Sequence, residues 1–485
     1  MQKRILLSGM GLLFSFLSNA QNEIDALRYS NLNYSGTARF NAMGGAFGAL
    51  GADPSNFSIN PAGIALYNKS EISFSPYIFV RSTNSEYNGT SSADSKSSFN
   101  IGNIGLNATY KNYPVDTAEG WINTNFAIGY NNLNNFHNRI SIYGDNLGSS
   151  YLTDVLLKSA NGKPSDDFDK FSTDLAYQTF LINPDTSAGA NAYTSAIPSG
   201  SNLVQSKSIE SRGVMGETYI TFGGNYSNKL YLGGTVGIDH IRYHEESSYR
   251  EEDADNSISD FKSYTYNSDV STKGVGFNFK FGFIYRATDW VRFGGSVHSP
   301  TFFNMTDNYS NKMNSYFDNG DAYETSSPAG SFDYVLTTPM RATGSLAFII
   351  AKMGSVSADY EFVDYSSASL SSSPNVFFEA NSAIINKYTS TGNLRLGTEW
   401  KVKPFSIRGG YALFGNPYKS GTGNNASRST YSLGFGIREK NYFLDFTYSL
   451  SRGSEKYYMF DPTLVNAASN TINSSAFVTT LGFRF

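Results

Sequence analysis

Cysteine is absent from the chain, and histidine and charged residues are scarce. Without cysteine among 485 residues, a disulfide framework, a zinc–thiolate site and a thiol nucleophile are all excluded. The four histidines are scattered along the sequence, so no Ser–His–Asp grouping can be argued from it. We therefore expect neither an enzyme nor a protein that holds a cofactor.

Long apolar runs are also rare, and the 37 basic residues are fewer than the 41 acidic ones. After the N-terminal segment, no stretch offers the roughly 18 consecutive apolar residues of a membrane-spanning helix. The formal net charge is −4 and charged residues make up only 16% of the chain. This mild acidity argues against nucleic acid as a partner.

The first 20 residues have the pattern of a secretory signal peptide. Lys3 and Arg4 supply positive charge, residues 5–17 are mostly apolar, and residues 18–20 form a small-residue cleavage site. The alternative is a membrane anchor, which would need a span of about 20 apolar residues. We predict a signal peptide over residues 1–20, cleaved after Ala20.

Aromatic residues are abundant, with 34 tyrosines and 37 phenylalanines, and apolar residues recur at alternate positions. In residues 121–130, one face carries Ile122, Thr124, Phe126, Ile128 and Tyr130, and the other carries Asn123, Asn125, Ala127 and Gly129. A period of two indicates a β-strand with one apolar and one polar face.

Fourteen such segments follow one another, divided by connections that are alternately short and long. The long connections, such as 301–331 and 366–387, are rich in Ser, Asn, Asp and Gly. The predicted strands are 71–81, 100–111, 121–143, 211–226, 230–246, 262–286, 290–299, 333–350, 354–365, 389–402, 405–415, 428–438, 441–452 and 472–485. An even strand number, short periplasmic turns and long extracellular loops are typical of outer-membrane barrels. The fold prediction is all-β: a 14-stranded antiparallel transmembrane β-barrel over residues 71–485.

Nine charged residues occupy the polar faces of these strands. On a lipid face each would cost roughly 2–4 kcal/mol at mid-depth, and less for acids, so the polar face is expected to line the lumen. The nine residues are Arg292, Arg341, Asp359, Glu361, Arg395, Glu399, Arg408, Arg438 and Asp445.

Three of the predicted lumen arginines are candidates to bind the carboxylate of a ligand. Arg341, Arg395 and Arg408 qualify because a guanidinium group grips a carboxylate in a bidentate manner. The alternative is that they pair with the acidic residues of the same lumen, among them Glu361 and Glu399.

The last nine residues alternate apolar side chains up to a terminal Phe485. This ending resembles the C-terminal assembly signal of bacterial outer-membrane barrels. Together with the signal peptide, it predicts the bacterial outer membrane as the location. The outer-membrane lipid and the barrel assembly machinery are the expected partners.

A glycine-rich segment, residues 41–63, lies before the first strand. Its glycines do not give the Gly-x-Gly-x-x-Gly spacing of a dinucleotide loop, and it has no lysine for a phosphate loop. It is therefore expected to be a tightly packed irregular segment. Residues 21–70 would enter a barrel from its periplasmic side and can fold into the lumen as a plug.

Residues 34–67, "YSGTARFNAMGGAFGALGADPSNFSINPAGIALY", resemble the N-terminal hatch of the FadL-type outer-membrane transporters of hydrophobic compounds. The shared features are an early Ser-Gly, small residues through the middle, and an Asn-Pro-Ala element near the end. The strand number and the terminal phenylalanine agree with that family. The resemblance thus covers nearly the whole mature chain.

The resemblance implies a barrel plugged by its own hatch, residues 21–70, that passively takes up hydrophobic small molecules such as long-chain fatty acids. Outer loops would capture the ligand, and hatch movement with a sideways opening in the wall would release it. Asn60, Pro61 and Ala62 carry the hatch motif; a plain Asx-Pro turn is the alternative. A second hypothesis is a barrel of this fold that holds secreted proteins at the cell surface and hands them on.

The longest insertion, residues 145–207, is predicted to be an extracellular loop with two short amphipathic helices. Their apolar side chains would form either a groove that captures ligand or a core that caps the barrel. The candidate residues are Leu152, Val155, Leu156, Phe168, Phe171 and Leu175.

Two further features concern the strands themselves. The run "NNLNNFHN", residues 131–138, interrupts the alternation of the third strand, which indicates either a bulge that opens the wall or the point where the strand leaves the membrane. His240 and His244 are four residues apart on a predicted strand, about 13 Å at 3.3 Å per residue. We therefore expect them not to share a metal ion.

Overall fold

The computed structural model describes residues 22–112, 119–351, 353–374 and 376–485. The predicted signal peptide, residues 1–20, lies outside the described residues. In the described part, no helix is both long and apolar enough to span a bilayer. The main strands are β1 (Glu71–Tyr87), β2 (Thr90–Lys111), β3 (Trp121–Asn135), β4 (Asn138–Leu147), β7 (Asn202–Tyr226), β8 (Leu230–Glu252), β9 (Phe261–Arg286), β10 (Val291–His298), β11 (Phe302–Phe317), β13 (Gly330–Thr337), β14 (Arg341–Ile350), β15 (Gly354–Asp364), β17 (Ser390–Val402), β18 (Phe405–Phe414), β19 (Arg428–Arg438), β20 (Tyr442–Tyr457) and β21 (Ala468–Arg484).

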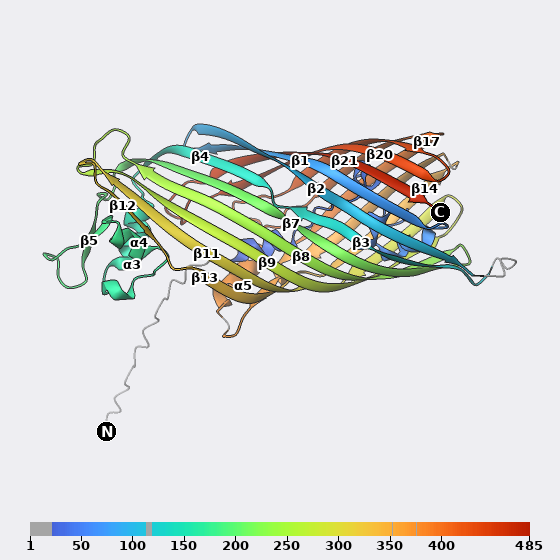
Figure 1. Ribbon diagram of the computed structural model, residues 1–485, viewed down its shortest axis with the longest axis horizontal. Helices are drawn as coiled ribbons and strands as arrows, with labels where there is room; N and C mark the ends of the chain where they lie inside the picture. The colour runs from blue at the N-terminus through green and yellow to red at the C-terminus, as the bar shows by residue number, and fades with distance from the viewer. Residues whose placement is uncertain (1–21, 113–118, 352, 375) are drawn as a thin grey trace, which may run out of the picture.

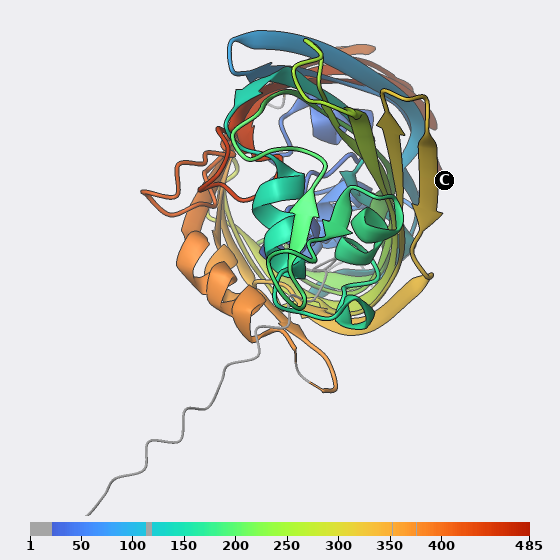
Figure 2. The same cartoon turned by 90° about the vertical axis from the view of Figure 1, so that its left-hand side faces the viewer.

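These strands form one closed antiparallel barrel (Figures 1 and 2). The sheet closes where β1 pairs with β21, from Glu71↔Arg484 to Glu86↔Ser469. Three wall strands are each split into two segments, β3–β4, β10–β11 and β13–β14, while β12 (Ala322–Ser326) and β16 (Ser369–Ser371) are short additions. Within the described residues the wall therefore has fourteen strands, which confirms the predicted fold.

The two faces of the wall differ as the alternation predicts. On β9, Phe279 and Phe281 expose 64 and 55% of their surface, whereas Asn278 and Lys280 beside them expose 3 and 7%. Outward aromatic and aliphatic side chains recur around the barrel, as in a lipid-facing belt. The polar faces point into the lumen, where many of their hydrogen-bonding groups find partners on the plug or on neighbouring strands.

The strands extend further outward than the alternation indicated. β2 begins at Thr90 and β7 at Asn202, and β11 lies within 301–331, which was predicted to be a loop. That prediction is wrong because these extensions lie beyond the apolar belt. Their outward residues are polar, so the strands lack an apolar face, yet their backbones stay paired, as β11 does with β9 from Phe302 to Phe317.

The N-terminal segment fills the lumen as a plug (Figures 1 and 2). It contains α1 (Glu23–Ser30), α2 (Ala38–Ala42) and two 3-10 helices, η1 (Pro54–Ser58) and η2 (Pro61–Leu66). Short helices leave carbonyl groups without internal partners, and inward polar side chains of the wall bind them. Asn125 donates to the Ile64 carbonyl at 3.0 Å, and Ser296 donates to the Ile59 carbonyl at 2.7 Å.

Inward glycines let the plug backbone touch the wall. A Cβ added to Gly410 of β18 would lie 2.2 Å from the nitrogen of Gly44. Gly44 has a φ of +61°, a conformation that favours glycine. The small residues of the glycine-rich segment thus permit close backbone contact between plug and barrel.

A cap covers the outer mouth of the barrel (Figure 2). It contains η3 (Leu152–Leu157), which has the wider hydrogen bonding of a π-helix, α3 (Lys158–Ala160), η4 (Ser165–Asp167) and α4 (Thr173–Gln178), followed by the small hairpin β5 (Ile182–Pro184) and β6 (Tyr193–Ser195). Two further outer elements, η5 (Tyr365–Ser367) and α5 (Phe378–Lys387), lie between β15 and β17. α5 falls within 366–387, which was also predicted to be a loop.

Candidate functional site

Asn60, Pro61 and Ala62 lie where the plug meets the wall. The Asn60 Oδ1 accepts from the Ala62 N–H at 3.1 Å, which caps η2, and Pro61 occupies its first turn. The Asn60 Nδ2 donates to the carbonyls of Gly48 at 2.7 Å and of Phe283 at 3.1 Å. Asn60, only 1% exposed, therefore joins two parts of the plug to β9.

The three predicted arginines lie in the lumen, beside buried carboxylates. Arg341 and Arg395 both pair with Glu361, at 2.9 and 3.1 Å. Arg408 lies 2.8 Å from both Glu399 and Asp445. The structure thus gives each of them an acidic partner. Because removing one partner leaves an uncompensated buried charge, a structural role suffices to explain these pairs.

A cavity of about 240 Å³ lies on the outer side of the plug, between the plug and the inner faces of β1 and β18–β21. Phe40 and Gly45 of the plug contribute to its boundary, and Phe79, Phe414 and Ile472 of the wall give it an apolar side. Its lining of polar and apolar side chains suits an amphipathic group.

Two arginines line this cavity without an acidic partner. Among the described residues, no carboxylate lies within ion-pair distance of Arg81 or Arg428, although Glu455 also lines the cavity. Arg81 donates to the Ser474 hydroxyl at 3.3 Å. The Arg428 guanidinium lies 4.3 Å from the ring centroid of Phe414, and its Nε and Nη2 atoms are buried without a hydrogen-bond partner.

An unpartnered buried guanidinium is unusual, because charged groups lose much hydration free energy on burial. In this cavity, the Arg428 guanidinium has N–H donors free for an anionic group, next to an apolar surface. The sequence analysis did not single out Arg81 or Arg428: Arg81 is the last residue of the predicted strand 71–81 but lies within β1, and Arg428 is the first residue of β19. Strand parity could have found them, because Arg81 shares the inward face of Tyr77 and Phe79.

The candidate capture residues lie together in the cap, but within a packed core. Leu152, Leu156, Phe168 and Leu175 are at most 4% exposed and belong to one apolar cluster with wall residues such as Tyr264. The first predicted helix is present. The second is shorter than expected: α4 starts at Thr173, so Phe168 and Phe171 precede it.

The remaining capture candidates and the base of the cap are partly exposed. Val155 is half-buried, and the ring of Phe171 packs 5.0 Å from that of Tyr309. Tyr151 lies at the base of the cap. Its removal from water, which is the largest cause, and the negative charges of Asp169 and Glu251 raise the pKa of Tyr151 to about 12. A role of this cluster in ligand capture stays a prediction, and it would require the core to open.

The wall is interrupted at the position of the "NNLNNFHN" run. The pairing of β3 with β7 shifts register between Asn132 and Asn134, and the strand breaks before β4 begins at Asn138. Beyond Asn103↔Asn131, β2 no longer pairs with the third strand. We call the facing stretch of β2 (90–102) and β4 the seam.

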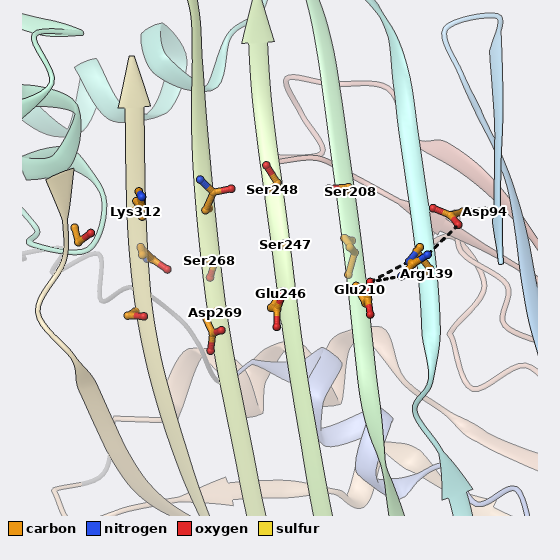
Figure 3. A pocket seen from close by; sticks show the side chains of 15 residues that line it. Asp94, Arg139, Ser208, Glu210, Glu246, Ser247, Ser248, Ser268, Asp269 and Lys312 are labelled. Carbon is orange, nitrogen blue, oxygen red and sulfur yellow. Dashed lines mark hydrogen bonds and ion pairs between the residues drawn. The ribbon is translucent and has the colours of Figure 1, made fainter. Parts of the chain in front are cut away.

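Side chains of β2 bridge the seam, from its inner face to the outer face of β4 and β7, and one of them, the Ser92 hydroxyl, donates to the Ser141 main-chain carbonyl. Arg139 lies 2.6 Å from Glu210 and 4.0 Å from Asp94 (Figure 3), and the Ser141 hydroxyl donates to Asp94 at 2.9 Å. Lys96 also pairs with Glu210. Exposed ion pairs contribute little stability each, so the seam is a weak line in the wall.

The outer surface next to the seam holds a polar hollow of about 580 Å³ (Figure 3). Near its edge, ligand atoms of His244, Glu246 and Asp269 lie within 4.8 Å of one another. Arg212 already pairs with Glu246 at 3.2 Å, and His240 is not part of this group. The cluster is a surface ion-pair network as it stands.

No family model and no curated protein matches the sequence, but solved structures share its fold. The P. putida toluene transporter TodX has a TM-score of 0.57 and 12% identity over 93% of this chain and 99% of its own. A Pseudomonas aeruginosa FadL homologue gives 0.54 and 15% over 93 and 98%, and the Ralstonia pickettii toluene transporter TbuX 0.52 and 15% over 93 and 99%. The chain has the FadL-type fold, and the predicted 14-stranded barrel of this type is confirmed.

Proposed function

We propose that the chain is an outer-membrane channel for passive uptake of hydrophobic small molecules that carry an acidic group, such as long-chain fatty acids. The observation that supports this most is the cavity above the plug, where Arg81 and Arg428 make no direct ion pair and lie beside the rings of Phe79 and Phe414, with Glu455 as the carboxylate whose charge acts on Arg81. A carboxylate would satisfy the free guanidinium donors, while an alkyl chain would cover the apolar side. The solved relatives of this fold include toluene transporters.

The seam gives this route an exit. A ligand in the cavity meets the plug below it, and the wall is weakest where β2 and β4 meet without backbone hydrogen bonds. Release at the inner end of the seam, beside the outward Phe99 and Ile101 of β2, which are 71 and 37% exposed, would deliver a hydrophobic molecule to lipid rather than to water, which its apolar surface favours. Movement of the plug around Asn60 would open the way from the cavity to the seam.

The proposal is tested by extracting the protein, purified from native outer membranes in a non-alkyl detergent, and analysing the organic phase by mass spectrometry. We expect a stoichiometric fatty acid or a similar acidic lipid. An extract without lipid, from protein that co-purifies with a secreted protein, would contradict uptake and support the carrier hypothesis.

Replacing Asn60 and Pro61 with alanine is expected to slow fatty acid uptake several-fold while the barrel still assembles. The change removes the donor to the Gly48 and Phe283 carbonyls, and each lost buried hydrogen bond costs about 1–3 kcal/mol. The plug would then no longer move as one unit. Uptake of a labelled fatty acid and heat-modifiable gel mobility measure the two effects.

Asn68→Ala is the matched control, because Asn68 is an exposed asparagine at the end of the same segment. It should transport at the rate of the unaltered protein. Equal uptake by the Asn60→Ala/Pro61→Ala variant and this control would remove the plug motif from the mechanism.

A further inference from the structure

Helix α5 lies at the outside of the barrel wall (Figures 1 and 2). One side of it packs on the protein: Phe377, Ile384 and Tyr388 are at most 3% exposed, in a cluster with Leu370. Asn381 fastens the helix to β16, accepting from the Leu370 N–H at 2.9 Å and donating to its carbonyl at 2.8 Å. The buried positions recur at a helical spacing.

The opposite side of α5 is apolar and bare. Phe378 exposes 80% of its surface and Ile385 exposes 57%, and their spacing of seven residues places them on one helical face. Val376, just before the helix, exposes another 44%. Large apolar side chains on such a face indicate a surface that is covered by something other than water.

Strand pairing shows where this face lies relative to the lipid belt. Asn381 is bonded to Leu370, Leu370 is paired with Leu336 of β13, and Leu336 is paired with Phe303 of β11. Phe302, one position away, points outward and is 56% exposed. The helix is therefore attached two strand spacings from Phe302, at the outer rim of the apolar belt, and its bare face adjoins that belt.

The C-terminal end of α5 contacts the plug. Lys387 pairs with Glu23 of α1 at 2.6 Å, and the Tyr388 hydroxyl donates to the Glu23 carbonyl at 3.0 Å. Ala26 and Leu27 of α1 belong to the same apolar cluster as Ile384 and Tyr388. One short helix thus contacts both the rim of the belt and the first helix of the plug.

We propose that α5 is an interfacial helix whose Phe378–Ile385 face lies in the outer leaflet and anchors α1 of the plug to the membrane. The partner is lipid, because the exposed face is apolar, adjoins the lipid belt and ends at Lys387, whose ammonium group stays at the polar level. This contact is separate from ligand uptake and holds whether or not the barrel transports.

Single-tryptophan variants test this placement. The three native tryptophans, Trp121, Trp290 and Trp400, are replaced with phenylalanine, and tryptophan is introduced by Phe378→Trp. The protein is reconstituted into phosphatidylcholine vesicles with acyl chains brominated near the headgroup. Bromine quenches only indoles in contact with those chains, so we expect strong quenching and a blue-shifted emission.

Three further variants complete the test. A protein that keeps only Trp400, 44% exposed on the belt, sets the level for lipid contact, and Tyr323→Trp on β12, beyond the rim, sets the level for water. Ile385→Trp is a second reporter on α5, in case Phe378→Trp fails to assemble. Emission of an α5 reporter as unquenched as that of Tyr323→Trp would overturn the proposal.

Discussion

Replacing both Arg81 and Arg428 with glutamine is expected to weaken binding of palmitate to the purified protein by about tenfold to a hundredfold. Glutamine keeps a neutral amide donor at each position, so the expected loss is the equivalent of one hydrogen bond to a charged group, roughly 1.5–3 kcal/mol, and about 1.4 kcal/mol corresponds to a tenfold change in affinity. Hexadecanol has a chain of the same length without the carboxylate. Its affinity should change little, so the double variant should lose the preference for the acid over the alcohol.

Equilibrium binding of the two labelled lipids, in a non-alkyl detergent, measures that preference. Arg452→Gln is the matched control, because Arg452 is an exposed arginine on the outer face of β20, close along the strand to Glu455. An unchanged ratio of palmitate to hexadecanol affinity in the double variant would show that the cavity does not recognise the carboxylate. Loss of both affinities together would instead indicate a damaged cavity.

Locking the seam is expected to reduce fatty acid uptake to about a tenth or less, since a blocked gating step limits the whole passage. Asp94→Cys and Ser141→Cys place thiols where the two side chains now meet at 2.9 Å. The chain has no other cysteine, so a short reversible bis-thiol reagent will bridge this pair alone. A reducing agent should restore uptake.

A second cysteine pair separates the seam from the general effect of cross-linking. Thr306 and Asp333 touch at 2.6 Å on β11 and β13, which are joined by backbone pairing. Bridging Thr306→Cys to Asp333→Cys should leave uptake unchanged. If the seam bridge also leaves uptake unchanged, the exit lies elsewhere and the cavity proposal is unaffected.

The sequence predicted the wall well because strand parity is a local signal. A period of two placed Arg395 and Asp359 inward without knowledge of any partner, and both are buried. The glycine-rich segment was correctly expected to pack tightly. These features depend on nearest neighbours in the chain, which a single sequence displays.

What the sequence could not supply depends on pairing between distant residues. The "NNLNNFHN" run indicated a break, but only the register shows that β2 loses its pairing with the third strand beyond Asn103 while it stays paired with β1. α5 was taken for a loop because serines precede it. The helical spacing of Phe377, Asn381, Ile384 and Tyr388 was the signal that could have revealed it.

The contacts of α2 with the last two strands determine when the plug can bind during assembly of the barrel. The Ala38 N–H donates to Thr480 of β21, 442 residues later in the chain, at 2.7 Å, and the Ala38 carbonyl accepts from Thr447 of β20. The binding surface for the plug is therefore complete only when the last two strands are in place. We expect closure of the barrel and binding of the plug to occur in one step. An open barrel without its plug is then never present in the permeability barrier.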